Sequence, residues 1–377
     1  MKKHAFLLAA LTLLLGASCT QKAETTLSGL NPADFETVVD GKPVALYTLK
    51  NAAGMEVCIT NFGGRIVSLM VPDRNGEMRD VVLGFDNIAD YQNVPSDFGA
   101  SIGRYANRID HGRLIIDGDT VQLPQNNFGH CLHGGPDGWQ YKVYEARQLD
   151  GKTLELYMDS PDGDENFPGR VEAKVTYNLT DDNAIVIAYE ATTDAPTVVN
   201  MTNHSYFNLS GDPTRTILDH LLTVDADSYT PVDSTYMTTG EIAPVEGTPM
   251  DFRTETAVGA RLHENNEQLK NANGYDHNWV LATAGDAERT ATRLVSPETG
   301  ICLTVRTTEP GIQIYSGNFL DGTVKGKGGI VYNPRTAICL ETQHYPDSPN
   351  KPQWPSTLLR PGEKYESLCI YGFSIAE

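Results

Sequence analysis

Apolar and polar residues alternate along this chain with a period of two. Apolar side chains occupy every second position from Val171 to Leu179, and again from Ile185 to Tyr189. The polar turn Asp181-Asp182-Asn183 separates the two runs. Because successive side chains of a strand point to opposite faces, the pattern predicts a hairpin with one buried face.

Short runs of the same kind recur through most of the chain. Turn dipeptides such as Asn75-Gly76 and Asp117-Gly118 separate many of them, and no long helical repeat is sustained. The chain is therefore predicted to be all-β, a large antiparallel β-sandwich that binds ligands on a concave sheet face or in loops at one end. The further predicted strands cover residues 55–60, 64–71, 112–117, 141–147, 153–158, 217–224, 301–307, 311–315, 336–341 and 368–375.

Composition supports one folded domain with a neutral ligand. Hydrophobic residues make up 40% of the 377, which is enough for a sizeable core. The chain is predicted to form one domain over 35–377, preceded by a polar tether over 19–34. The formal net charge of -20 repels phosphate backbones and anionic lipid, so nucleic acid is excluded as a partner.

The first residues have the pattern of an export signal. Lys2 and Lys3 precede an apolar run at 5–15, and Gly16-Ala17-Ser18-Cys19 follows. A basic start, a short apolar run and small residues before a cysteine predict a lipoprotein-type signal peptide over 1–18, with Cys19 lipidated as the first mature residue. Gly16 stands where leucine is usual in such signals, so ordinary cleavage near the same point is the alternative. Either way, the protein is expected to be exported, periplasmic or anchored to a bacterial membrane.

The other cysteines do not form a disulfide framework. They are odd in number, widely spaced and mostly inside apolar runs, which predicts buried free thiols. They are Cys58, Cys131, Cys302, Cys339 and Cys369.

Polar and aromatic residues interrupt the strand pattern in several segments. Together these segments supply histidines, carboxylates, arginines and amides, a set that suits a sugar: polar groups bind hydroxyls and aromatic rings stack on the apolar ring face. In chain order they are Arg104-Tyr105-Ala106-Asn107-Arg108, Leu132-His133-Gly134-Gly135, Asn203-His204-Ser205-Tyr206-Phe207-Asn208, Tyr275-Asp276-His277-Asn278, Gly311-Ile312-Gln313-Ile314-Tyr315-Ser316-Gly317-Asn318 and Glu341-Thr342-Gln343-His344.

The whole set, in this order, resembles the aldose 1-epimerase (galactose mutarotase) family. The similarity extends from about residue 35 to residue 377 and includes Val81-Val82-Leu83-Gly84-Phe85 and the closing Tyr371-Gly372-Phe373. Tyr105 stands where the family often has valine. Each segment alone has little specificity, whereas the ordered combination is highly specific.

The resemblance implies a role for each matching residue. Glu341 falls on the catalytic base of the family and His204 on its catalytic acid. The family fold is a large antiparallel β-supersandwich, and the resemblance implies action on free monosaccharides without a metal or organic cofactor. The protein is expected to be a monomer, although the sequence leaves the oligomeric state open. The positions that match sugar contacts are Asn107, Arg108, His133, Tyr206, Asp276 and Gln313.

The chemistry of anomer exchange fits these residue types. Opening a hemiacetal requires a base for the C1 hydroxyl proton and an acid for the ring oxygen, each worth about 10²–10⁴-fold in rate. A carboxylate is a ready base at neutral pH, whereas a histidine must be protonated to act as an acid. A nearby carboxylate raises the pKa of a histidine, and Asp276 is the candidate for that role beside His204.

Other readings of the motifs stay open at this stage. Gly99-Ala100-Ser101-Ile102-Gly103 matches the nucleophile elbow of esterases, although the elbow requires a strand–turn–helix context. His130-Cys131-Leu132-His133 offers metal ligands without a second clustered pair. A phosphorylated-sugar epimerase, a non-catalytic sugar-binding lipoprotein and a glycosidase pairing Glu341 with Asp276 are the neighbouring functions.

Overall fold

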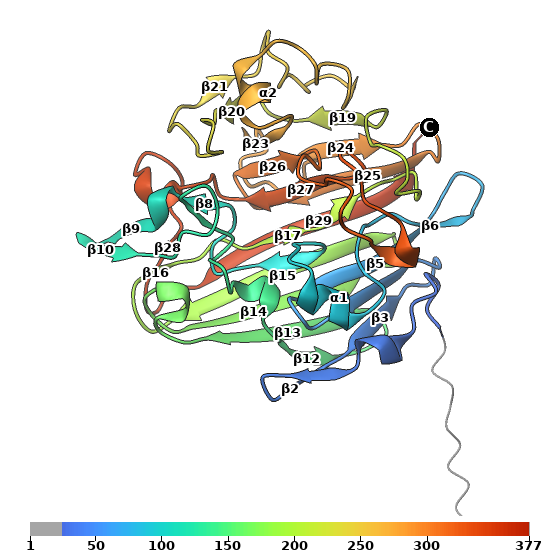
Figure 1. The fold of residues 1–377 in the computed structure, drawn as a ribbon, viewed down its shortest axis with the longest axis horizontal. Coiled ribbons are helices and arrows are strands. Elements are labelled where there is room, and N and C mark those ends of the chain that lie inside the picture. Colours follow the sequence, from blue (N-terminus) through green and yellow to red (C-terminus); the bar gives the residue numbers. More distant parts are fainter. Residues whose placement is uncertain (1–24, 377) are drawn as a thin grey trace, which may run out of the picture.

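A computed structural model describes residues 25–376 (Figure 1), and it confirms the prediction of a large antiparallel β-sandwich. The largest sheet has nine strands. In sheet order they are β12 (Glu145–Gln148), β13 (Thr153–Ser160), β14 (Val171–Leu179), β15 (Ala184–Thr193), β29 (Tyr365–Ile375), β25 (Ile301–Thr307), β24 (Thr292–Val295), β19 (Leu221–Val224) and β22 (Thr256–Ala257).

A six-stranded sheet forms the second layer. Its order is β18 (Tyr206–Phe207), β27 (Ile338–Gln343), β26 (Gly311–Tyr315), β23 (Asp276–Val280), β20 (Ser228–Thr230) and β21 (Ala243–Pro244). Tyr371 of β29 donates a 2.8 Å hydrogen bond to the carbonyl of Leu340 on β27, and its ring lies 5.1 Å from that of Phe207. These contacts join the two sheets across a shared apolar core.

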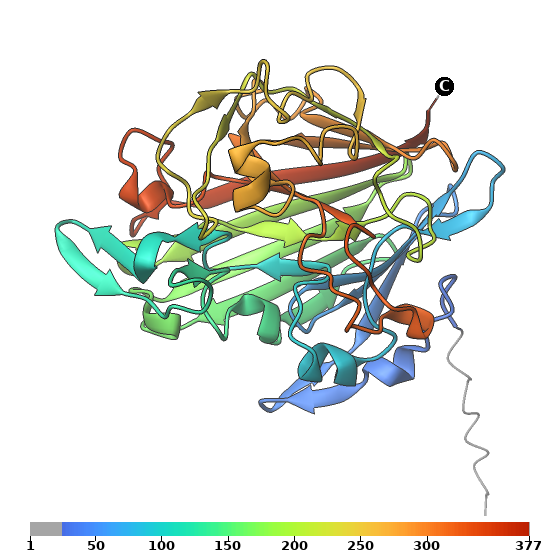
Figure 2. The same cartoon turned by 45° about the horizontal axis from the view of Figure 1, so that its top comes forward.

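Smaller sheets complete the molecule. Figure 2 shows short strands and connecting loops lying over one side of the long strands of the nine-stranded sheet. The four-stranded sheet contains β3 (Leu46–Lys50), β4 (Glu56–Thr60), β5 (Arg65–Pro72) and β6 (Met78–Asp80). The two-stranded sheets pair β1 (Thr37–Val39) with β2 (Lys42–Val44), β7 (Ala100–Ile102) with β17 (Thr202–His204), β8 (Arg108–Ile109) with β11 (Cys131–Leu132), β9 (Arg113–Ile116) with β10 (Asp119–Gln122), and β16 (Thr197–Val198) with β28 (Leu358–Leu359). The α-helices α1 (Ile88–Asn93) and α2 (Glu267–Asn271) are short.

The strand predictions are accurate where alternation is regular. β14 and β15 form the predicted hairpin, and the alternating apolar side chains of β14 are buried. The strand expected over 141–147 begins only at Glu145, because residues 139–141 form a 3-10 turn. Among the strands of five or more residues, β3 and β23 were not predicted, and several shorter strands such as β24 were also missed. β23 begins with the polar residues Asp276, His277 and Asn278, so no hydrophobic alternation marks it.

The domain begins before the predicted boundary at residue 35. Within the tether predicted over 19–34, Thr26 and Leu30 are buried. The backbone N–H of Leu27 donates a 2.6 Å hydrogen bond to Glu56, and the Ser28 hydroxyl bonds that of Ser68. These contacts make residues 26–34 part of the folded domain, a correction that the polar composition of the segment concealed.

The cysteine prediction is confirmed for the residues described. Cys58, Cys131, Cys302, Cys339 and Cys369 are all buried and free. Cys19 and the predicted signal peptide lie outside the described residues. Within residues 25–376, no helix is long and apolar enough to cross a membrane.

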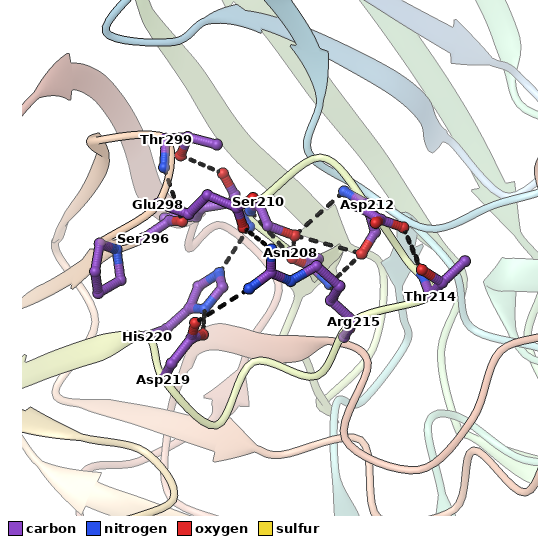
Figure 3. Close-up of polar contacts among 12 residues, drawn as sticks. Asn208, Ser210, Asp212, Thr214, Arg215, Asp219, His220, Ser296, Glu298 and Thr299 are labelled. Carbon is purple, nitrogen blue, oxygen red and sulfur yellow. Dashed lines mark hydrogen bonds and ion pairs between the residues drawn. The ribbon is translucent and has the colours of Figure 1, made fainter.

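Asn208, from the motif that contains His204, has a structural role. Its side-chain amide donates to the carbonyl of Thr336 at 2.8 Å. The amide also donates to the carbonyl of Arg215 at 3.0 Å, and the side-chain oxygen accepts from the Ser210 hydroxyl (Figure 3). The loop that follows β18 is thereby tied to the residues that precede β27. The same network holds the edge of the six-stranded sheet that carries the candidate site.

Replacing Asn208 should destabilise the fold. Asn208→Ala removes the donor to the buried carbonyl of Thr336 and to the partly buried carbonyl of Arg215, and we expect the free energy of unfolding to fall by about 2–4 kcal/mol. Urea unfolding followed by circular dichroism measures this change. Thr214→Ala is the matched control, because Thr214 bonds Asp212 at the exposed edge of the same network and should change stability by less than about 0.5 kcal/mol. Equal effects of the two variants would contradict the assignment.

Candidate active site

The register of β23, β26 and β27 gathers the polar motif residues on one face of the six-stranded sheet. Gln313 lies directly opposite both Asn278 and Glu341, and Tyr315 lies opposite Asp276. Side chains directly opposite one another on antiparallel strands project from the same face. The alternate positions of these strands, such as Ile312, Ile314 and Leu340, enter the apolar core. One face of the six-stranded sheet therefore packs into the apolar core, and the other presents the polar residues of the candidate site.

His204 comes to this face from the end of β17. Its Nε2 lies 3.5 Å from Glu341 Oε1, and both side chains are buried. The ring of His204 stacks on that of Tyr206, with centroids 5.0 Å apart and planes 24° apart. The ring of His133 meets it edge-on at 5.1 Å. These contacts hold the imidazole of His204 beside the Glu341 carboxylate.

Asn107 and His133 form a second unit of the site. The backbone N–H of Asn107 donates to His133 Nδ1 at 3.1 Å, and the N–H of His133 donates back to the Asn107 carbonyl at 2.9 Å. Because Nδ1 accepts, the ring proton of neutral His133 sits on Nε2. Burial lowers the pKa of His133 to about 3, so the ring is a neutral donor at physiological pH.

The two arginines of the Arg104–Arg108 segment have different positions. Arg104 turns away from the other site residues and donates to Ser160 and to the carbonyl of Gly169. Arg108 enters the site, where Asn127 accepts from its Nε at 3.1 Å and Tyr236 lies beneath its guanidinium at 5.2 Å. Arg108 is thus the arginine available to a ligand.

The site residues enclose a cavity of about 200 Å³. Seven predicted site residues line it: Asn107, Arg108, His133, His204, Tyr206, Asp276 and Glu341. Gln313 lies behind Asp276 and donates to its carboxylate at 2.7 Å, so its role as a sugar contact stays a prediction. Leu132 and Tyr315 also line it and belong to the polar segments found in the sequence, whereas Asp97, Asn127 and Phe319 lie outside the segments listed there. A larger cavity of about 540 Å³ lies between β2 and β13, away from the motif residues.

Comparison with known proteins decides the family. The family profile described as aldose 1-epimerase matches residues 45–372. A galactose mutarotase from Mus musculus is 44% identical over 322 residues, covering 85% of this chain and 92% of the mouse protein. An aldose 1-epimerase from Escherichia coli is 41% identical over 340 residues, covering 90% of this chain and 97% of the bacterial protein. The chain belongs to the aldose 1-epimerase family.

Solved structures agree with this assignment to the aldose 1-epimerases. An aldose epimerase homologue from C. elegans superposes with a TM-score of 0.82 at 32% identity, over 89% of this chain and 100% of that one. A galactose 1-epimerase from Lactobacillus acidophilus gives a TM-score of 0.80 at 29% identity, over 90% of this chain and 97% of that one. The predicted supersandwich fold and the predicted class of enzyme, an isomerase, are therefore confirmed.

Burial dominates the electrostatics of the epimerase site. It raises the pKa of Glu341 well above the usual range, and the charges of Asp276 and Asp97 raise it further, whereas Arg108 lowers it. Burial also raises the pKa of Asp276, against the opposing effects of Arg108 and Gln313. For His204, burial lowers the pKa, and the carboxylate that opposes this shift is Asp97. The sequence analysis expected Asp276 to raise the pKa of His204. Its charge raises the pKa of Glu341 instead.

The structure does not support the esterase elbow or the metal site that two sequence motifs suggested. Ser101 lies within β7, fully buried, and its hydroxyl bonds the Tyr177 hydroxyl at 2.7 Å, whereas the elbow serine of an esterase is exposed on a turn. His130 and His133 belong to separate clusters, because His130 bonds Thr235 and the backbone of His111. The histidine pair of that motif therefore does not form one metal site.

Other groups of potential metal ligands coincide with the epimerase site itself. Asp97, His133 and His204 each offer a ligand atom within 4.8 Å of the others, and so do His204, Cys339 and Glu341. Both groups contain residues that the family resemblance assigns to acid–base chemistry or sugar contacts. The absence of a metal requirement stays a prediction.

The buried charge of Glu341 should reduce stability at neutral pH. Because its pKa in the folded protein is raised, the native state holds this proton more tightly than the unfolded chain does. Stability then falls as pH rises from the ordinary glutamate range through the raised pKa. We expect Glu341→Gln to increase the free energy of unfolding relative to the unsubstituted protein, and the difference to grow from about pH 4 to about pH 7.

Urea unfolding at the two pH values measures this difference. Glu241→Gln is the matched control, because Glu241 is exposed and the same substitution there should give no pH-dependent change. A Glu341→Gln protein that is less stable than the original at neutral pH would show that the carboxylate stabilises the fold.

Proposed function

We propose that this aldose 1-epimerase interconverts the α and β anomers of free aldohexoses with Glu341 as the base and His204 as the acid. The observation that carries the proposal is the 3.5 Å approach of His204 Nε2 to Glu341 Oε1 at the wall of a cavity of about 200 Å³. A base and an acid that close together reach the C1 hydroxyl and the adjacent ring oxygen of one hemiacetal.

The reaction then follows from proton positions. Glu341 removes the C1 hydroxyl proton while protonated His204 gives a proton to the ring oxygen, and the C1–ring oxygen bond breaks. Rotation about the C1–C2 bond presents the other face of the aldehyde, and the reverse transfers close the ring. Atoms and charges balance, because the proton lost by the acid equals the proton gained by the base.

Burial suits the state reached after ring opening. It favours protonated Glu341 and neutral His204, which is the pair left when the aldehyde has formed. Before the reaction, ionised Glu341 and protonated His204 also share one proton between them. The two states therefore interconvert by transfer through the substrate, without exchange with solvent.

The other lining residues bind the sugar in this proposal. Neutral His133 presents its Nε2 proton as a hydrogen-bond donor, and Arg108 with Asp276 offers a charged donor and acceptor for hydroxyls. Tyr206 and Tyr315 supply aromatic surface beside these polar groups. The relatives named galactose mutarotase support galactose as a substrate, and glucose differs from it at one hydroxyl.

A neutral sugar fits better than a phosphorylated one. Asp97, Asp276 and Glu341 line the cavity, against the single guanidinium of Arg108. Carboxylates repel a phosphate group, which requires a basic pocket. A non-catalytic sugar-binding protein is also disfavoured, because binding alone does not require a buried histidine beside a buried carboxylate.

Polarimetry tests the acid–base assignment. With freshly dissolved α-D-galactose or α-D-glucose, the protein should accelerate the approach to equilibrium rotation relative to buffer. We expect Glu341→Gln and His204→Asn each to lower kcat by about 10²-fold or more, because each removes one positioned proton transfer. Glu241→Gln, an exposed site, is the matched control and should keep full activity.

The outcomes separate the neighbouring functions. Near-normal rates for a folded Glu341→Gln variant would remove the base assignment. Acceleration with a hexose 6-phosphate but with no free aldose would redirect the proposal to a phosphorylated substrate. Binding of a sugar without any acceleration would favour the sugar-binding alternative.

We propose further that the enzyme is exported and anchored through a lipid on Cys19. The support is the basic and apolar leader followed by Gly16-Ala17-Ser18-Cys19. When the full chain is expressed in a bacterium supplied with radiolabelled palmitate, the protein should carry label and enter the detergent phase. Cys19→Ser should abolish both, whereas Cys58→Ser, a buried thiol, should not. A soluble, unlabelled full-length protein would contradict the anchor.

A further inference from the structure

Asp97 is a third carboxylate of the site, and neither the motifs nor the family resemblance pointed to it. It lies between α1 and β7 and lines the cavity with His133 and His204. One ligand atom of each of the three residues lies within 4.8 Å of the others. Its Oδ1 is buried and has no hydrogen-bond partner among the described residues. The residue as a whole is half-buried, and a buried polar oxygen without a hydrogen-bond partner calls for a functional explanation.

The backbone on both sides of Asp97 is clamped in place. Arg65, which is fully buried, donates to the carbonyl of Ser96 at 2.9 Å and to that of Phe98 at 3.0 Å. It also donates to the carbonyl of Gln140 at 2.8 Å. The guanidinium thus bonds the carbonyls that flank Asp97, while the described contacts include no ion pair between the two side chains. This arrangement fixes where the carboxylate points without neutralising it at close range.

Asp97 is one of two carboxylates among the groups that face His204. Glu341 and Cys339 face the ring from β27, Tyr206 from β18 and Tyr315 from β26. His133 faces it edge-on, and the buried guanidinium of Arg65 opposes a positive charge there. Among these groups the carboxylates are Glu341 and Asp97. Glu341 is the proposed base and takes up the substrate proton, so Asp97 is the carboxylate of this set to which the reaction assigns no proton.

We propose that Asp97 is a positioning residue that orients the His133–His204 pair and stabilises the protonated imidazole of His204 while it acts as the acid. The proposal rests on the function proposed above. It assigns no bond making or breaking to Asp97, and it needs no group beyond those that line the cavity.

The electrostatic effects of Asp97 give a specific signature. Its charge raises the pKa of His204, of His133 and of Glu341. Removing that charge therefore lowers the pKa of the proposed base and of the proposed acid together. Because both pKa values fall, both limbs of the pH–rate profile of the Glu341–His204 pair move to lower pH.

The test uses Asp97→Asn, which keeps the shape and removes the charge, and Asp97→Glu, which keeps the charge. Mutarotation of galactose is followed by polarimetry from about pH 4 to about pH 9, a span that covers the ordinary histidine range. We expect Asp97→Asn to shift both limbs to lower pH, so that kcat/KM measured on the alkaline limb falls, by about tenfold for a shift of one pKa unit. Asp97→Glu should return both limbs toward their original positions.

Two further variants make the result decisive. Asp119→Asn removes one exposed charge on the protruding β9–β10 hairpin and should leave the profile unchanged (Figure 1). Asp97→Ser is a second neutral variant in case Asp97→Asn does not fold, as judged by thermal melting.

Two outcomes of the kinetic test would overturn the proposal, and a third moves the test to NMR. Unshifted limbs in a folded neutral variant would show that Asp97 does not act through His204. A higher KM for one sugar with both limbs in place would make Asp97 a substrate contact instead. If the unsubstituted protein accelerates no mutarotation, the proposed function fails. Asp97 is then tested by NMR titration of the His204 ring, whose midpoint should fall in Asp97→Asn, and an unchanged midpoint would remove the positioning role.

Discussion

The pairing of β23, β26 and β27 in one antiparallel sheet is the constraint on which the rest of the site depends. Their apolar side chains alternate with Asp276, Gln313 and Glu341, so burying one face in the core necessarily gathers the polar set on the other. A one-residue slip of β27 would send Glu341 into the core and Leu340 into the cavity. The core therefore secures the register that the chemistry needs.

The same burial that organises the site works against its charges. Desolvation raises the pKa of Glu341 and Asp276 and lowers that of His133 and His204. Hydrogen bonds and Arg108 offset part of this effect. The result is a site whose neutral forms are favoured at rest and whose charged forms arise as protons pass through the substrate. The buried carboxylates lower the free energy of unfolding, and the same groups provide the proton transfers of the site.

Segments outside the six-stranded sheet supply the remaining residues of the site. His204 reaches Glu341 from β17, His133 and Asn107 come from paired loops, and Asp97 is held by carbonyls that Arg65 binds. Each is positioned by backbone hydrogen bonds or ring packing rather than by the six-stranded sheet. The site combines a rigid sheet face with residues from connecting segments over it, which is how β-sandwiches commonly present functional groups.

The sequence alone determined the all-β class, most of the longer strands, the free thiols and, through the ordered motifs, the family and most of the residues that line the cavity. Period-two alternation is local, so a single strand reveals it. The tertiary structure decided which residues meet: that Arg108 enters the cavity and Arg104 does not, that Gln313 lies behind Asp276, and that Asp97 lies near His133 and His204. It also revealed β23, whose first residues are polar. These features depend on register and on contacts between residues far apart in the chain, which no local pattern encodes.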